Sequence, residues 1–237
     1  MRLNVIHDRA PQRSAEPVLL VMLPSAKACP RDLVEYGFMR TMRKRGLPVD
    51  VIAVDAHLGY YLDGSFNKRL HDDVIAPARA RKYRRIWLMG ISLGGMGSLL
   101  YAREHPTNIE GLILLAPFIG LRGTIAEVVR AGGLTQWQPG IIKADDDERR
   151  LLAWFKTFEA GAPALPEIYL GYGTADRFAT AIQLLAARLP PARVTTITGG
   201  HDWNTWLHLW QQLLDQNLFC AKQTRQRAPL EKRPRPT

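Results

Sequence analysis

A run typical of a buried strand, Arg84–Met89, leads directly into Gly90-Ile91-Ser92-Leu93-Gly94 and then into a helical pattern. The pattern Gly-x-Ser-x-Gly between a strand and a helix is typical of a sharp turn that presents the serine hydroxyl. Its glycines leave out side chains that would collide where strand and helix fold back on each other. Because backbone N–H groups at a helix N-terminus favour developing negative charge, the pattern indicates acyl-transfer chemistry at Ser92. The alternative is a glycine-rich turn that carries an inactive serine.

Length and composition fit one globular domain. The chain has 237 residues, of which 46% are hydrophobic and 23% charged, and α/β folds of this length often form a single unit. No apolar stretch approaches the ~20 residues that span a bilayer. The first residues lack the apolar centre of a signal peptide. We therefore expect a cytoplasmic protein without a membrane span.

The basic charge is concentrated near the C-terminus. Residues 221–237 carry six basic side chains against one acidic side chain, which is half of the formal net charge of +10. This segment contains prolines and almost no apolar residues, so we expect a disordered basic tail. We expect no nucleic-acid partner, because no base-reading motif accompanies the charge. Cys29 and Cys220 form no metal-ligand pattern, and free thiols are favoured over a bridge between them.

Strand and helix patterns alternate along most of the chain. Continuous apolar runs predict buried strands, and apolar residues at helical spacing predict helices. The expected strands are 18–23, 49–54, 85–89, 111–116, 167–172 and 193–198. The expected helices are 31–45, 67–79, 93–104, 178–188 and 203–219. Such alternation predicts an α/β fold over residues 1–220, with a mostly parallel central sheet flanked by helices on both faces.

The alternation is interrupted at residues 117–164, where helical patterns are expected only near 124–130 and 146–159. We interpret this stretch as a small helical cap, inserted where it would cover a site at the carboxyl ends of the strands. An ordinary pair of covering helices is the alternative.

A serine hydroxyl is a weak nucleophile at neutral pH and needs a base, usually a histidine oriented by a carboxylate. In hydrolases with this layout the order along the chain is serine, acid, histidine. His201 lies in the loop Gly-Gly-His-Asp-Trp, directly after the last expected strand, whereas His105 and His208 fall on helices. We therefore predict that His201 is the base.

Asp176 is the predicted acid, because it follows the strand that ends at Tyr172. The alternatives are Asp202 and the acidic run at residues 145–148. Adjacent residues rarely face each other well enough to bond, so Asp202 is better interpreted as a helix N-cap. The acidic run is typical of the first turn of a helix.

An oxyanion hole needs two backbone donors. The amide of Leu93, directly after the serine, is the first expected donor. The second is expected in the loop Pro24-Ser25-Ala26-Lys27, where Ala26 is preferred and Ser25 is the alternative.

Three aromatic residues near the expected catalytic edge are candidates for substrate binding: Tyr60, Tyr61 and Trp203. Packing in a turn or in the core is the alternative for each of them. His71, Asp72 and Asp73 are consecutive on an expected helix and therefore point in different directions. We predict no metal site and no cofactor.

The elbow at Gly90–Gly95, the Gly-x-x-Asp segment that ends at Asp176 and Gly-Gly-His-Asp-Trp at 199–203 together resemble the α/β-hydrolase superfamily. The resemblance is strongest to its small bacterial serine esterases and covers roughly residues 17–219. It implies a triad of Ser92, Asp176 and His201 and an acyl-serine intermediate. Relatives often carry His-Gly where this chain has Pro24-Ser25. This difference lies in the loop that is expected to supply the second oxyanion donor, so the resemblance does not specify which amide of that loop donates.

The leading hypothesis is a serine hydrolase that cleaves a small-molecule carboxylic ester or thioester. The alternative is a catalytically silent binding or scaffold protein that uses the basic tail. Peptidase and acyltransferase activities stay open, because a triad does not fix the final acyl acceptor. The sequence does not specify the oligomeric state.

Overall fold

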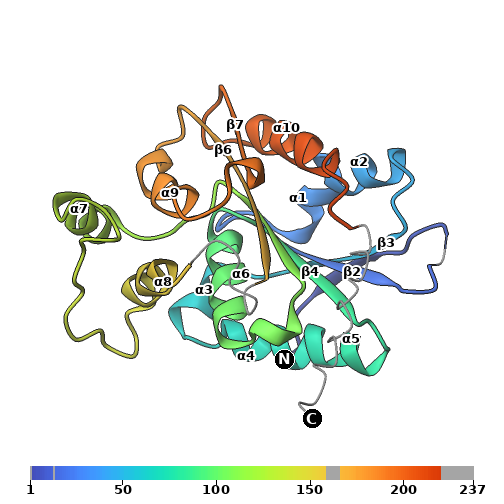
Figure 1. Cartoon of the computed structure of the whole chain (residues 1–237). Helices are drawn as coiled ribbons and strands as arrows, with labels where there is room; N and C mark the ends of the chain where they lie inside the picture. The colour runs from blue at the N-terminus through green and yellow to red at the C-terminus, as the bar shows by residue number, and fades with distance from the viewer. Residues whose placement is uncertain (1, 13, 159–165, 220–237) are drawn as a thin grey trace, which may run out of the picture.

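A seven-stranded sheet runs through the centre of the molecule (Figure 1). The computed structural model describes residues 2–12, 14–158 and 166–219. The strands are β1 (Val5–Asp8), β2 (Val18–Leu23), β3 (Val49–Val54), β4 (Arg85–Ile91), β5 (Gly111–Leu115), β6 (Glu167–Gly173) and β7 (Val194–Ile197). Their order across the sheet is β1-β3-β2-β4-β5-β6-β7. Only β1 pairs antiparallel, with β3, and the other neighbouring pairs are parallel. The prediction of a mostly parallel sheet is confirmed.

Helices cover both faces of this sheet, as predicted. The α-helices are α1 (Pro30–Glu35), α2 (Phe38–Lys44), α3 (Leu58–Leu62), α4 (Phe66–Leu70), α5 (Ala76–Ala80), α6 (Leu93–Glu104), α7 (Arg122–Arg130), α8 (Asp147–Lys156), α9 (Ala179–Ala186) and α10 (Trp203–Leu214). A π-helical turn, η1 (His71–Ile75), joins α4 to α5, and short 3-10 turns lie at η2 (Pro106–Asn108) and η3 (Pro191–Arg193). In Figure 1, α1, α2 and α10 lie on one face, and α4, α5 and α6 lie on the other.

The central helix α6 is buried on all sides from Leu93 to Ala102. Its sequence is rich in glycine and serine, so the sheet and the neighbouring helices approach its backbone closely. A helix that is buried all round needs no amphipathic pattern. Strand β4 before it and strand β5 beside it are also buried almost throughout. The turn between β4 and α6 is therefore held by the best-packed part of the molecule.

The structure differs from the sequence expectations in three local features. The expected helix 31–45 is divided into α1 and α2, because Gly37 adopts a left-handed φ of 86°. The expected helix 67–79 contains the π-helical turn η1 ahead of Pro77, a residue that has no N–H to continue the α-helical ladder. The edge strand β1, with only four residues, was not expected from the sequence.

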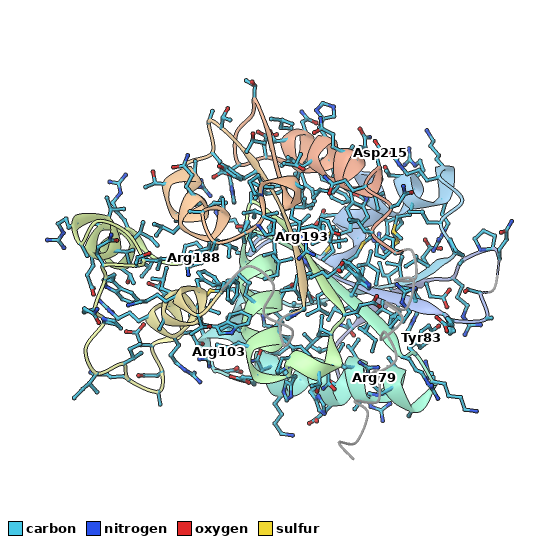
Figure 2. The ribbon with its side chains drawn as sticks, viewed as in Figure 1. Arg79, Tyr83, Arg103, Arg188, Arg193 and Asp215 are labelled. Carbon is cyan, nitrogen blue, oxygen red and sulfur yellow. The ribbon has the colours of Figure 1, made fainter. Side chains whose placement is uncertain are left out.

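Helix α8 is joined to the body of the molecule at its C-terminal end. Arg188, labelled in Figure 2, donates hydrogen bonds to three carbonyl oxygens there, those of Phe155, Lys156 and Phe158, at 3.2, 3.0 and 2.9 Å. Such bonds satisfy carbonyls that have no partner inside the helix. Helix α8 also packs against α6. The stretch 117–164 thus places a helix beside α6, which begins at Leu93. Residues 159–164 of that stretch lie outside the described residues.

No helix in the described part of the chain has the length and apolar character needed to cross a membrane. Cys29 is exposed with a free thiol. The expected basic tail at 221–237 and Cys220 lie outside the described residues.

Candidate active site

Ser92 occupies the turn between β4 and α6. Its φ of 51° and ψ of −113° lie in a region that residues with a side chain rarely adopt. The backbone holds this conformation through both polar groups. The Ser92 amide donates to the Leu115 carbonyl at 3.0 Å, and the Ser92 carbonyl accepts from the amides of Gly95 and Phe118 at 2.9 Å each. The predicted strand-turn-helix geometry is therefore present around the serine.

Two glycines of the motif permit close backbone contacts. A Cβ added to Gly90 would lie 2.2 Å from the carbonyl oxygen of Gly94. A Cβ added to Gly94 would lie 2.2 Å from the carbonyl oxygen of Leu23, at the end of β2. Since both neighbours are backbone atoms, neither can move aside without shifting an element. Gly94 thus lets the loop after β2 lie directly against the serine turn.

We expect Gly94→Ala to lower the free energy of unfolding by about 3 kcal/mol, because overpacking against backbone forces the loop after β2 away from α6. Gly123→Ala is the matched control. Gly123 lies in α7 with no atom within 4 Å of an added Cβ, so this change should stabilise by about 0.5–1 kcal/mol through helix propensity. Urea unfolding of both variants measures the difference. Equal stability of the two variants would contradict the close contact at Gly94.

Ser92, His201 and Asp176 form one hydrogen-bonded chain. The Oγ atom of Ser92 lies 2.9 Å from Nε2 of His201, and Nδ1 of His201 lies 2.7 Å from Oδ2 of Asp176. The Asp176 side chain has no exposed surface, and that of His201 is 8% exposed. A carboxylate can only accept, so Nδ1 carries the proton and Nε2 is left as the acceptor that faces the serine. The structure thus brings together the three residues predicted as the triad, in the arrangement that proton transfer requires.

Glycines also explain why the acid and the histidine meet. Asp176 follows β6 and His201 follows β7, and the two strands are neighbours. A Cβ added to Gly173 would lie 2.3 Å from the carbonyl oxygen of Gly199. The same carbonyl accepts a hydrogen bond from the amide of Ala175 at 2.9 Å. The two loops therefore run in contact until their side chains meet.

Two aromatic rings flank the histidine. The Phe178 ring lies 4.9 Å from the His201 ring at 81°, and the Trp206 ring lies 4.9 Å from it at 87°. Edge-on packing of this kind is favourable for aromatic pairs and limits rotation of the imidazole. Phe178 was not singled out from the sequence. Its position two residues after the predicted acid was the available signal.

The expected oxyanion donors lie on the two elements that Gly94 brings together. Leu93 is the first residue of α6, so its amide has no acceptor within the helix. Ala26 lies in an exposed turn that is closed by a 3.0 Å hydrogen bond from the Ala28 amide to the Ser25 carbonyl. The roles of Leu93 and Ala26 stay predictions.

Tyr60 and Tyr61 lie on α3, after β3. The Tyr60 ring packs on His57 at 4.1 Å and under the guanidinium of Arg69 at 4.6 Å. Tyr61 stacks on Phe66 at 4.3 Å. Burial raises the pKa of the Tyr61 hydroxyl above its ordinary value. Both tyrosines thus have packing roles, and substrate contact by either stays a prediction.

Trp203 begins α10, two residues after His201. Its ring stacks on Tyr36 at 4.2 Å and 7°, and meets the Trp206 ring at 5.2 Å and 75°. An aromatic path therefore joins Trp203 to the histidine through Trp206. Substrate binding by Trp203 also stays a prediction.

The alternative acids serve as helix caps. Asp202 accepts from the Thr205 amide at 2.9 Å at the start of α10, and this hydrogen bond is the first cause of the lowered pKa of its carboxyl. Asp146 caps α8 by accepting from the Arg149 amide at 3.0 Å. Both arrangements stabilise helix N-termini.

The alternative histidines lie elsewhere. His105 stacks on His71 at 4.9 Å beside Tyr101, at the far end of α6. His208 is exposed in the middle of α10.

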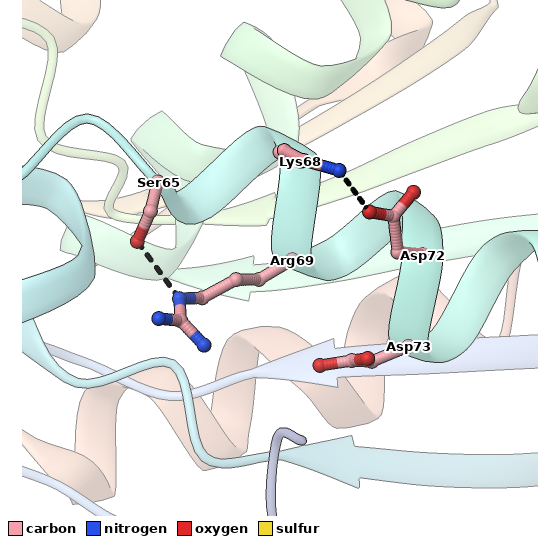
Figure 3. A pocket seen from close by; sticks show the side chains of 5 residues that line it. All are labelled: Ser65, Lys68, Arg69, Asp72 and Asp73. Carbon is pink, nitrogen blue, oxygen red and sulfur yellow. Dashed lines mark hydrogen bonds and ion pairs between the residues drawn. The ribbon is translucent and has the colours of Figure 1, made fainter. Parts of the chain in front are cut away.

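A separate cavity of about 270 Å³ lies over α4 and η1 (Figure 3). It is lined by side chains that pair with one another or with backbone: Ser65, Lys68, Arg69, Asp72 and Asp73. Lys68 forms an ion pair with Asp72, and the Oγ atom of Ser65 accepts from Arg69 at 2.8 Å. None of the triad residues lines it. Among the described residues, no group of three or more His, Cys, Asp or Glu side chains gathers as a metal site would.

Comparison with known proteins supports the fold. The family model described as serine aminopeptidase, S33, matches residues 67–143, a range that includes the serine turn. The fold is similar to that of S-formylglutathione hydrolase from Agrobacterium tumefaciens, with a TM-score of 0.60, 17% identity, and coverage of 90% of this chain and 88% of that one. The chain thus has the α/β-hydrolase fold.

Two further α/β-hydrolase structures are similar over nearly their whole length. Fluorophosphonate-binding serine hydrolase F of Staphylococcus aureus gives a TM-score of 0.61 at 12% identity, covering 91% of this chain and 98% of that one. A protein of Butyrivibrio proteoclasticus with bound ferulic acid gives 0.58 at 14% identity, covering 91% and 94%. No curated protein sequence matches the chain. At these identities the likeness establishes the shared α/β-hydrolase fold.

Proposed function

We propose that this protein is a serine hydrolase that cleaves a carboxylic ester or thioester through an acyl-serine intermediate. The observation that carries the proposal is the hydrogen-bonded chain from Ser92 through His201 to the buried Asp176. A glycine-rich turn with an inactive serine would give no reason for a histidine and a buried carboxylate to line up behind it.

Acylation follows from the direction of these hydrogen bonds. Ser92 Oγ attacks the carbonyl carbon while its proton passes to His201 Nε2. The positive charge that forms on the imidazole is stabilised by the Asp176 carboxylate, which accepts a hydrogen bond from the Nδ1–H group of His201. The amides of Leu93 and Ala26 donate to the oxyanion. His201 then gives its proton to the departing alcohol or thiol, which leaves the acyl group on Ser92.

Deacylation repeats the sequence with water. The oxygen of a water molecule attacks the acyl carbon while His201 Nε2 takes a proton from that water. His201 then returns a proton to Ser92 Oγ as the acyl–oxygen bond breaks. The released product is the carboxylic acid. The closed cycle consumes one water and needs no cofactor.

The nature of the substrate is supported by two relatives. One similar structure is an S-formylglutathione hydrolase and another holds ferulic acid, which favours a small-molecule ester or thioester for this chain. We further propose that residues 117–164 act as a cap, since α8 packs against the helix that begins at Leu93. The exposed free thiol of Cys29 fits the proposed cytoplasmic location.

Intact-protein mass after exposure to a fluorophosphonate tests the proposal directly. We expect one adduct on the wild-type protein and none on Ser92→Ala, because only an activated serine attacks the phosphorus. Turnover of 4-nitrophenyl esters and thioesters then defines the class of bond. An aminoacyl 4-nitroanilide in the same assay tests the peptidase activity suggested by the name of the family model. A folded wild-type protein that gains no adduct would contradict the proposal.

A further inference from the structure

Two phenylalanines lie beside the proposed catalytic pair. The Phe118 amide donates to the carbonyl of Ser92 at 2.9 Å, which fixes Phe118 next to the serine. The Phe118 ring meets the Phe178 ring edge to face at 5.5 Å and 80°. Phe178 in turn packs edge-on against His201 at 4.9 Å. Both phenylalanines are partly exposed, so an apolar wall with accessible surface adjoins the Ser92–His201 pair.

The guanidinium group of Arg177 packs against this apolar wall. The Cζ atom of Arg177 is 4.9 Å from the centre of the Phe178 ring, within the range of cation–π contact. Arg177 is exposed, and in the ranges that the structure describes it forms no ion pair with a carboxylate. Its neighbour Asp176 does not serve as a partner, because Oδ2 faces His201 and Oδ1 accepts from the Phe178 amide at 2.8 Å. The guanidinium is thus positioned by an aromatic ring with its N–H donors unused by an acidic side chain.

The positive charge of Arg177 lies close to the proposed catalytic residues. Arg177 lies one aromatic ring away from the histidine, at the carboxyl edge of the sheet where the serine turn also lies. A planar guanidinium held by stacking is well suited to paired hydrogen bonds with a carboxylate.

We propose that Phe118, Phe178 and Arg177 form a substrate subsite, in which the rings contact an apolar part of the ester and Arg177 binds an ionised carboxylate of the same molecule. The inference rests on the proposed hydrolase function and deepens it. The substrate class is an ester or thioester that carries a second, anionic group. Arg177 is then a specificity-determining residue.

Matched ester pairs test the subsite. 4-Nitrophenyl butyrate and mono-4-nitrophenyl glutarate differ by a carboxylate on the acyl part. Phenyl butyrate and 4-carboxyphenyl butyrate differ by one on the leaving group. We expect the wild-type protein to prefer the anionic member of at least one pair in kcat/KM. Arg177→Gln should reduce that preference roughly three- to tenfold, mainly through KM, and Arg177→Glu should reverse it. Added salt should weaken the wild-type preference.

Arg84→Gln is the matched control, because it removes the same charge at the amino end of β4, the opposite edge of the sheet. It should keep the wild-type preference. Equal turnover of both members of each pair by the wild-type protein, or a preference that survives Arg177→Gln, would overturn the subsite. If neutral esters are hydrolysed and Ser92 is labelled without any charge preference, the proposed function stands and the subsite alone fails. Absence of Ser92-dependent turnover of every ester would overturn both.

Discussion

Replacing Ser92 by alanine is expected to lower kcat/KM for an activated ester by about 10⁴-fold or more, because no other group takes over the nucleophile's role. Stability should change little, since alanine keeps the Cβ and the same backbone. Ser92→Gly should abolish turnover equally but raise the free energy of unfolding by about 1 kcal/mol. The reason is that φ at this position is 51°, a conformation that costs a residue with a side chain on the order of 1–3 kcal/mol and glycine much less.

Ser98→Ala is the matched control for this pair. Ser98 is also buried on α6, but its hydroxyl donates to the Gly94 carbonyl at 2.9 Å and not to a base. Its loss should cost about 1 kcal/mol of stability and leave the serine turn in place. Ester kinetics and urea unfolding of the three variants separate the chemical role of the hydroxyl from the strain of the turn. Ester turnover by Ser92→Ala near the wild-type rate would disprove the nucleophile, and destabilisation by Ser92→Gly would disprove the strain.

The sequence predicted the fold and the meeting of the three triad residues for a shared reason. Both depend on local patterns repeated along a parallel sheet. Continuous apolar runs such as Val18–Leu23 mark buried strands, and the carboxyl ends of parallel strands lie at one edge. Ser92 directly follows β4, and Asp176 and His201 lie three and four residues after the ends of β6 and β7. Chain order along the sheet therefore limited the candidates. Their catalytic roles stay predictions until kinetics test them.

What the sequence did not predict depends on contacts between distant segments. The rings of Phe178 and Trp206 flank His201 only because the loop after β6 meets the start of α10. The amide of Phe118 donates to the Ser92 carbonyl between the segments that follow the neighbouring strands β5 and β4. No spacing rule connects these positions. The division of the expected helix 31–45 at Gly37 was locally readable, since glycine favours a positive φ, but the apolar stripe continued across it.

Asp176→Asn is expected to lower kcat/KM about 10⁴-fold while the protein stays folded. Both carboxylate oxygens accept hydrogen bonds, from His201 Nδ1 at 2.7 Å and from the Phe178 amide at 2.8 Å. An asparagine side chain has only one oxygen, and that oxygen accepts the hydrogen bond from the Phe178 amide. The amide NH₂ then faces Nδ1, which must become the acceptor, so the imidazole proton moves to Nε2. A histidine in this tautomer donates to Ser92 and does not remove its proton.

The neighbouring acid supplies the control for this prediction. Asp202→Asn keeps a side-chain oxygen that accepts from the Thr205 amide, as Asp202 does at 2.9 Å, and asparagine is as good an N-cap as aspartate. This variant should therefore retain most of its turnover and its stability. The pKa of the Asp202 carboxyl is lowered chiefly by that hydrogen bond. The charge of Asp202 therefore stabilises the fold above the ordinary aspartate pKa, and this contribution is lost as the pH falls through the lowered value.

Steady-state ester kinetics of Asp176→Asn and Asp202→Asn at neutral pH make the comparison. A large loss in Asp202→Asn with little change in Asp176→Asn would transfer the role of the acid to Asp202, against the hydrogen-bonded arrangement of Ser92, His201 and Asp176.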